Sequence, residues 1–129
     1  MMTSKDCSNL AALEGQCSYH DANKAEFKRL AMKLLRELAK TLGLEKSTYV
    51  IRYNAFGIAC SGDATLHADN VYVSMNADMV GLGIMVRTCH GRRDFTGGHN
   101  NWHSYQRLAA DGIERLAGTV RWVMQGEPK

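Results

Sequence analysis

The spacing of apolar residues changes twice along the chain, and each change predicts a different kind of secondary structure. Between Asp21 and Leu42 apolar residues recur at i, i+3, i+4 and i+7, which places them on one face of a helix. They are Phe27, Leu30, Ala31, Leu34, Leu35, Leu38 and Leu42. The pattern predicts an amphipathic helix from about Asp21 to Leu42, with Asp21 or Asn23 as its N-cap and Gly43 beyond its end.

From Thr48 the apolar spacing falls to two, which is typical of half-buried strands. The predicted strands are 48–53, 57–61, 63–68, 70–76 and 82–90, the second and third being either separate or one strand bent at Gly62. Short turns between them favour an antiparallel meander.

Alternation sorts the predicted sheet into two faces. The face toward the helices carries Leu66, Val71, Val73, Met75, Leu82, Ile84 and Val86. The other carries Thr65, His67, Tyr72, Ser74, Met85, Arg87 and Cys89, joined by Arg52. A solvated face is the ordinary interpretation. The alternative is a docking platform built on Arg52, His67, Tyr72 and Arg87.

The helical spacing returns from about Trp102 to Gln125 and predicts one long helix. Its apolar face comprises Tyr105, Ala109, Ile113, Leu116, Val120, Val123 and Met124. A second stripe, Leu108, Gly112, Arg115, Thr119 and Trp122, lies off that face. Two interpretations stay open for it: a self-association or partner surface, with a homodimer as one form, or burial under the N-terminal arm.

The chain as a whole fits a single α+β domain over 1–129, with an N-terminal helix, a four- or five-stranded antiparallel sheet and a C-terminal helix on the same face. Residues 1–20 hold few large apolar side chains beyond Leu10 and Leu13, which predicts a loose arm with at most a short helical turn. With 129 residues, 45% hydrophobic and one proline, the chain is long enough to bury a modest core.

Charge and apolar content narrow the functional classes. The net charge of +3 is well short of that expected for a dedicated nucleic-acid binder and excludes an acidic DNA mimic. The basic stripe Arg29, Lys33, Arg36 and Lys40 on the first long helix is either a solvated face or a phosphate-tracking one. No segment has the roughly 18 apolar residues of a membrane span, so the expected location is the cytoplasm.

The most chemically distinctive stretch runs from Ile84 to Tyr105. Its candidate binding residues combine forked donors, flexible backbone, stacking rings and amides: Arg87, Arg92, Arg93, Gly97, Gly98, Phe95, Trp102, Asn100 and Asn101. Together they suit a nucleotide-like anion or an acidic protein patch. The alternative is an ordered surface loop whose aromatic rings plug the edge of the core.

Catalytic and metal chemistry is weakly indicated. Cys7, Cys17, Cys60 and Cys89 are widely spaced and form no CxxC pair, which predicts reduced, metal-free thiols and no cofactor. A zinc site can be drawn from Cys89, His99 and His103, but its spacing matches no standard pattern. The sequence contains no HExxH, GxSxG or Walker motif.

Two runs, GIACSGDATLHADNVYVSM (57–75) and GLGIMVRTCHGRRDFTGGHNNW (81–102), resemble a group of short open reading frames of bacteriophages and other mobile elements. The resemblance covers roughly residues 49–102. It implies a small non-enzymatic protein of the host cytoplasm, an anti-CRISPR-like inhibitor that binds a host protein or nucleoprotein defence complex. The alternatives are a sponge for a nucleotide or other phosphate-bearing small molecule, and a small hydrolase or metal-dependent enzyme.

Overall fold

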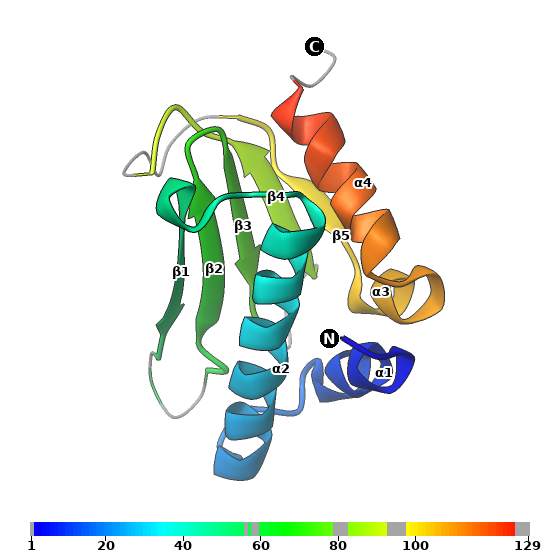
Figure 1. The fold of residues 1–129 in the computed structure, drawn as a ribbon. Coiled ribbons are helices and arrows are strands. Elements are labelled where there is room, and N and C mark those ends of the chain that lie inside the picture. The colour runs from blue at the N-terminus through cyan, green and yellow to red at the C-terminus, as the bar shows by residue number, and fades with distance from the viewer. Residues whose placement is uncertain (1, 56, 58–59, 79–82, 93–97, 126–129) are drawn as a thin grey trace.

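The computed structural model describes residues 2–55, 57, 60–78, 83–92 and 98–125, which form two layers: a five-stranded antiparallel sheet, and helices on one of its faces (Figure 1). The elements are α1 Ser4–Leu13, α2 Asp21–Thr41, the 3₁₀ turn η1 Lys46–Thr48, β1 Tyr49–Asn54, β2 Asp63–Ala68, β3 Val71–Met75, β4 Ile84–Thr88, β5 Asn101–His103, α3 Tyr105–Asp111 and α4 Ile113–Met124. The predicted α+β class is confirmed.

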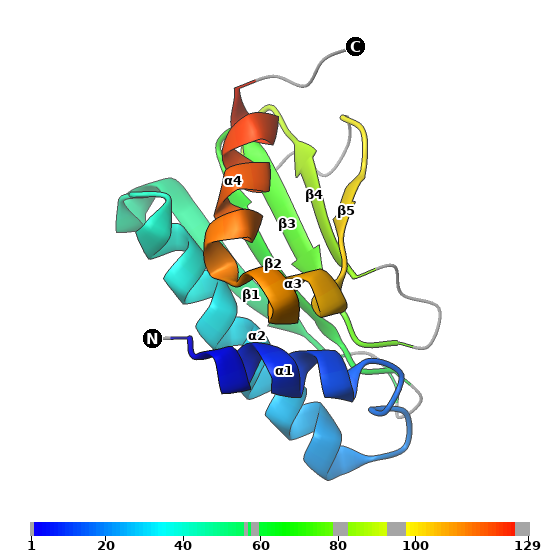
Figure 2. The same cartoon turned by 90° about the vertical axis from the view of Figure 1, so that its right-hand side faces the viewer.

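The expectation of a loose N-terminal arm is wrong, because α1 is a full helix. Thr3 and Asp6 form a reciprocal capping box, in which each side chain accepts a hydrogen bond from the backbone N–H of the other. Cys7 and Leu10 are buried, and α1 packs against α3 and α2 (Figure 2). Lys33 of α2 adds an ion pair to Asp6 at 2.8 Å. Two buried residues are enough to hold α1 in place, because the helix packs against other helices.

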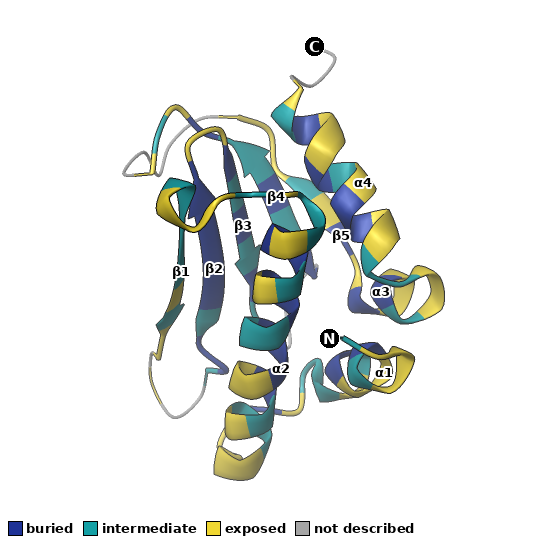
Figure 3. Ribbon diagram, viewed as in Figure 1, coloured by how far each residue is buried: buried dark blue, intermediate teal, exposed yellow. Residues whose placement is uncertain are grey.

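The predicted helix over 21–42 is confirmed as α2, which ends one residue earlier. Its N-cap is His20, whose ring nitrogen accepts a hydrogen bond from the Asn23 N–H, so Asp21 and Asn23 are not the cap. The buried side of α2 faces the sheet, as the dark stripe in Figure 3 shows. Helix α2 covers β1 and β2, while α4 covers β3 and β4.

The sheet is a meander in the order β1-β2-β3-β4-β5, with every neighbouring pair antiparallel. The predicted faces are confirmed for the described residues: Leu66, Val73 and Val86 lie in the core, while Tyr72 and Arg87 stand opposite each other on the uncovered face. Gly57 and Cys60 of the predicted strand 57–61 are not in a strand, and Ile58 and Ala59 lie outside the described residues.

The predicted single helix from Trp102 to Gln125 is wrong in two ways. Its first residues form β5, which pairs with β4. The rest is broken at Gly112, whose φ of 80° and ψ of 179° are incompatible with a helix. An L residue rarely adopts that φ, so glycine lets the chain turn between α3 and α4. Helix α4 can then lie over the sheet and bury Leu116, Val120 and Val123. No helix of the described part of the chain is long and apolar enough to cross a bilayer.

Candidate functional site: a groove beside the edge strand

Strand β5 lies at one edge of the sheet, and its backbone can be oriented from the hydrogen-bond pattern. The Cys89 N–H donates to the Asn70 carbonyl oxygen across β3 and β4. Hydrogen-bonded and non-bonded pairs alternate in an antiparallel ladder. Because Cys89 directs its backbone groups toward β3, Val86, three residues earlier, directs its own toward β5, where it pairs with Asn101. The next residue, Trp102, therefore directs its N–H and C=O away from β4, toward the open edge.

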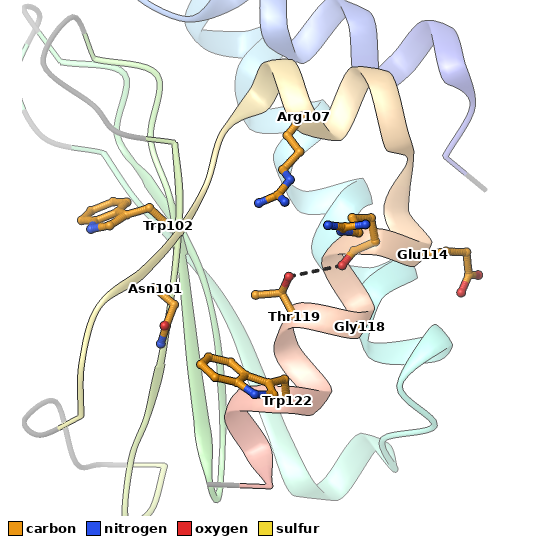
Figure 4. Close-up of a pocket in the computed structure, with 8 residues that line it drawn as sticks. Asn101, Trp102, Arg107, Glu114, Gly118, Thr119 and Trp122 are labelled. Atoms are coloured by element: carbon orange, nitrogen blue, oxygen red, sulfur yellow. Dashed lines mark hydrogen bonds between the residues drawn. The ribbon is translucent and has the colours of Figure 1, made fainter. Parts of the chain in front are cut away.

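A groove of about 470 Å³ separates this edge from α3 and α4. It is lined by Asn101, Trp102, Arg107, Glu114, Arg115, Gly118, Thr119 and Trp122. Figure 4 shows Trp122 pointing into the space between α4 and β5, whereas the Trp102 ring lies on the opposite side of the strand. The side chain of Trp102 thus joins the uncovered sheet face, and its backbone borders the groove.

Helix periodicity explains the α4 wall. Arg115, Thr119 and Trp122 recur at i, i+4 and i+7 and therefore share one face, beside the face that buries Leu116 and Val120. Thr119 donates its hydroxyl to the Arg115 carbonyl oxygen at 3.3 Å, so it is satisfied within the helix. Trp122 is 44% exposed. An exposed indole above a glycine leaves a recess that a ligand side chain can fill.

The groove carries a positive charge at one end. Arg107 contacts Asp111 at 4.0 Å, the outer limit of an ion pair, and both side chains are nearly half exposed. No hydrogen bond or ion pair of a described residue engages the Arg115 guanidinium. Glu114 points away from the groove in Figure 4. Two guanidinium groups are therefore available to an anion, and forked donors of this kind suit a carboxylate.

His103 lies beneath this charged end, fully buried on the helix side of β5. Neither ring nitrogen has a hydrogen-bond partner among the described residues. Burial lowers the pKa of His103, and the positive charges of Arg107 and Arg115 lower it further. The imidazole is therefore held neutral, and its unpaired nitrogens cost stability.

The uncovered sheet face was the second predicted surface. Tyr72 stands between His67 and Arg87: its ring centroid is 5.0 Å from that of His67, and the Arg87 guanidinium lies 4.9 Å above it. His67 is buried and Arg52 exposed. The structure thus brings His67, Tyr72 and Arg87 together, but they stack on one another and leave little ring surface for a ligand.

The predicted loop is described only in part, because Arg93, Phe95 and Gly97 lie outside the described residues. Arg92 donates to the Ser47 carbonyl oxygen at 2.6 Å and forms an ion pair with Asp69 at 3.1 Å. Asn101 donates to the carbonyl oxygens of Val86 and His99. The Arg92 and Asn101 side chains therefore bond the described ends of the loop to Ser47, Asp69 and Val86.

Gly98 and Asn100 complete the described part of the loop. Gly98 has a φ of 73°, and a Cβ there would lie 2.5 Å from the Thr88 hydroxyl oxygen. It therefore serves close packing of the loop against β4. Asn100 is exposed just before β5. That this loop binds a ligand stays a prediction.

The predicted stripe on the last helix is divided by the break at Gly112. Leu108 is fully buried in α3, against α1, so it cannot belong to an exposed interface. Arg115 and Trp122 remain exposed and line the groove. The sequence missed Arg107 and Gly118 because both require the β5 edge and the helix break to be known. The Ser104 cap, which accepts from the Arg107 N–H, was the available signal that a helix starts there.

The thiols and histidines form no metal site in the part of the chain that is described. No group of three or more His, Cys, Asp or Glu side chains there could hold a metal ion. His103 pairs with Ile84 at one end of β4, whereas Cys89 follows the other end, so the two are roughly 15 Å apart. No described cysteine is in a disulfide. Burial raises the pKa of Cys7 and Cys17.

Comparison of the chain with models of known protein families, with curated proteins and with solved structures gives no match. The geometry and charge of the groove therefore carry the functional conclusion.

Proposed function

We propose that the protein is a non-enzymatic inhibitor that binds a protein of the host cell through the groove beside β5. The observation that carries this proposal is the exposure of Trp122, 44%, in a groove that also holds Arg107 and Arg115. Tryptophan and arginine are the residues on which binding energy concentrates in protein interfaces. Exposing the Trp122 indole in a groove has a solubility cost that a partner surface would offset.

The resemblance of residues 49–102 to phage and mobile-element reading frames supports a host partner, and within that class a defence complex, as in an anti-CRISPR-like inhibitor. The groove borders the C-terminal end of this stretch, since β5 contains Trp102. The uncovered sheet face is the less favoured surface, because Arg87 and Tyr72 already contact each other.

Comparative capture from a host lysate tests the proposal. The baits are the wild-type chain, Trp122→Glu, and the control Tyr19→Asn. Tyr19 is another exposed aromatic residue, 74% exposed and not among those that line the groove. Its φ of 59° is one that asparagine adopts readily. We expect one host protein to be retained by the wild type and the control but lost from Trp122→Glu.

Two outcomes would contradict the proposal. The first is equal retention by all three baits. The second is no retained protein together with a melting temperature raised by nucleotides, which would favour the nucleotide sponge. Metal analysis and turnover assays of the same preparation address the enzyme alternative.

A further inference from the structure

We infer that the groove takes an extended segment of the partner, which adds as a strand to the free edge of β5 and places an acidic side chain at Arg107 and Arg115 (Figure 4). This inference rests on the proposed function and specifies its ligand as a short acidic peptide motif.

The backbone of β5 supplies the first argument. The N–H and C=O of Trp102 point toward the open edge, and β5 is the last strand of the sheet that the described residues form. Unpaired groups at a sheet edge are a template for another strand. An added segment satisfies both groups, and such main-chain bonds give affinity without specifying sequence. Since β5 has only three residues, a short segment of the partner suffices to cover it.

Side-chain alternation supplies the second argument, because successive residues of a strand point to opposite faces. The partner residue beside Trp102 faces the same way as the indole, onto the uncovered sheet face. Its two neighbours face α4. Figure 4 shows Arg107 at one end of the groove and Trp122 at the other. One neighbour therefore meets the guanidinium groups and the other meets the Trp122 ring.

The two contact points on α4 are compatible with this spacing. Arg115 and Trp122 are seven residues apart on a helix, about 10 Å, whereas alternate residues of a strand are about 7 Å apart. Long arginine and tryptophan side chains can close the difference of about 3 Å. Between them Gly118 leaves open space, since a Cβ there would meet nothing within 4 Å. The predicted motif is an acidic residue and an apolar residue separated by one position.

Charge complementarity favours an acidic residue in the partner segment at the arginine end of the groove. Arg115 has no ion-pair partner among the described residues, and the Arg107 to Asp111 contact is long at 4.0 Å. A partner carboxylate can accept from both guanidinium groups. The buried neutral His103 lies beside them and adds no competing charge. A second copy of this chain on the same edge is the competing occupant, and the experiment below separates it.

Selection from a displayed library of random nonapeptides, followed by affinity measurement, tests the inference. We expect enrichment of an acidic residue two positions from Leu, Ile, Phe or Trp. Fluorescence anisotropy of a labelled selected peptide should show at least about tenfold weaker binding to Arg107→Ala and Arg115→Ala, because each removes a charged hydrogen bond. The matched control is Arg36→Ala, an exposed arginine on α2, which should bind as the wild type does.

Backbone pairing is tested separately by scanning single N-methyl groups along the selected peptide. One position should lose at least about tenfold in affinity, because its N–H donates to the Trp102 carbonyl oxygen. Hydrogen exchange of the Trp102 amide should slow in the complex. The order of acidic and apolar residues in the selected motif then gives the direction of the added strand.

Several results would overturn the inference: no enriched peptide, a motif without an acidic residue, equal binding to Arg115→Ala, or a flat N-methyl scan. A dimer in light scattering that dissociates with Trp122→Glu would assign the edge to a second copy and also overturn it. If the peptide experiments fail but capture of a host protein still depends on Trp122, the proposed function stands and only the inference about its ligand is wrong. Failure of that capture contradicts the proposed function itself.

Discussion

The arginines on the two sides of β5 differ in what they already contact. Arg92, in the loop before the strand, is held by Asp69 and by the Ser47 carbonyl oxygen. Arg115, on the helix after it, has no such contact with a described residue and faces a groove. Both are exposed and both carry a full charge. Only the second has its donors available to a ligand.

This difference separates two roles that residue type alone cannot distinguish. Removing a guanidinium that is already bonded within the protein lowers its stability. Removing one that is not bonded lowers affinity for a partner and leaves the fold unchanged. The loop and the groove should therefore respond in opposite ways to the same kind of substitution.

The largest effect is expected from Trp122→Glu, which should weaken partner binding at least about 30-fold, the loss of about 2 kcal/mol typical of an interface tryptophan. Its free energy of unfolding should fall by only about 1–2 kcal/mol, because Trp122 is 44% exposed and the variant loses only the covered part of the indole. Titration calorimetry with the captured protein and urea unfolding measure the two quantities. Light scattering of the wild type and the variant also tests the homodimer prediction. Loss of folding in the variant would show that the indole is structural.

Combined replacement of Arg87, Arg92 and Arg93 by alanine should lower the free energy of unfolding. Arg87 loses its contact with the Tyr72 ring, and Arg92 loses an ion pair, which together contribute about 1–2 kcal/mol. Urea unfolding should register this loss, while affinity for the groove-selected peptide stays within about twofold. If binding disappears and stability does not change, the loop is the ligand site and the comparison between the two regions is reversed.

His103→Leu should raise the free energy of unfolding by about 1 kcal/mol at pH 7.5, because it removes two unpaired buried nitrogens. The folded state holds the pKa of His103 below 6.5, so the unfolded chain takes up the proton first as the pH falls. Wild-type stability should therefore decrease below about pH 6.5, and the advantage of the variant should grow toward pH 5.5. The exposed His99→Asn is the control. A constant difference between the two pH values would show that His103 titrates normally.

The smallest effect is expected from Arg29→Ala with Arg36→Ala, which removes two positive charges from the solvated face of α2. Both side chains are exposed, so unfolding should change by less than about 0.5 kcal/mol and partner affinity by less than about twofold. A larger loss of affinity that salt reproduces would show that non-specific attraction drives binding.

The sequence was most informative where one period persists over many residues. The spacing from Phe27 to Leu38 placed α2 within one residue of its observed ends, and the alternation of Leu66, Val73 and Val86 identified the core face of the sheet. Prediction from the sequence failed where an element is too short, or has too few buried residues, to show a period. Strand β5 has three residues, too few for a period, and α1 buries only Cys7 and Leu10 along its length.

The candidate site was predicted only in part, for a related reason. Trp122 and Arg115 stood out because they lie off the apolar face of their helix, and both line the groove. Burial under the N-terminal arm was one of the two interpretations left open for the stripe, and it holds for Leu108, which α1 covers. The sequence could not show that Gly112 separates Leu108 from the others. Whether a charged residue is already paired, as Arg92 is, depends on Ser47 and Asp69, which are distant in the chain.

The packing of α1 against α3 has a consequence for synthesis on the ribosome. The two helices are separated by the whole sheet, so roughly 90 residues must be translated before α3 follows α1. At about 5–20 residues per second, Cys7 and Leu10 await their covering helix for roughly 5–20 s. The meander itself, built from consecutive neighbours, can close in the meantime. Until then α1 can pack only against α2, with the Asp6–Lys33 ion pair between them, and its contact with α3 forms last.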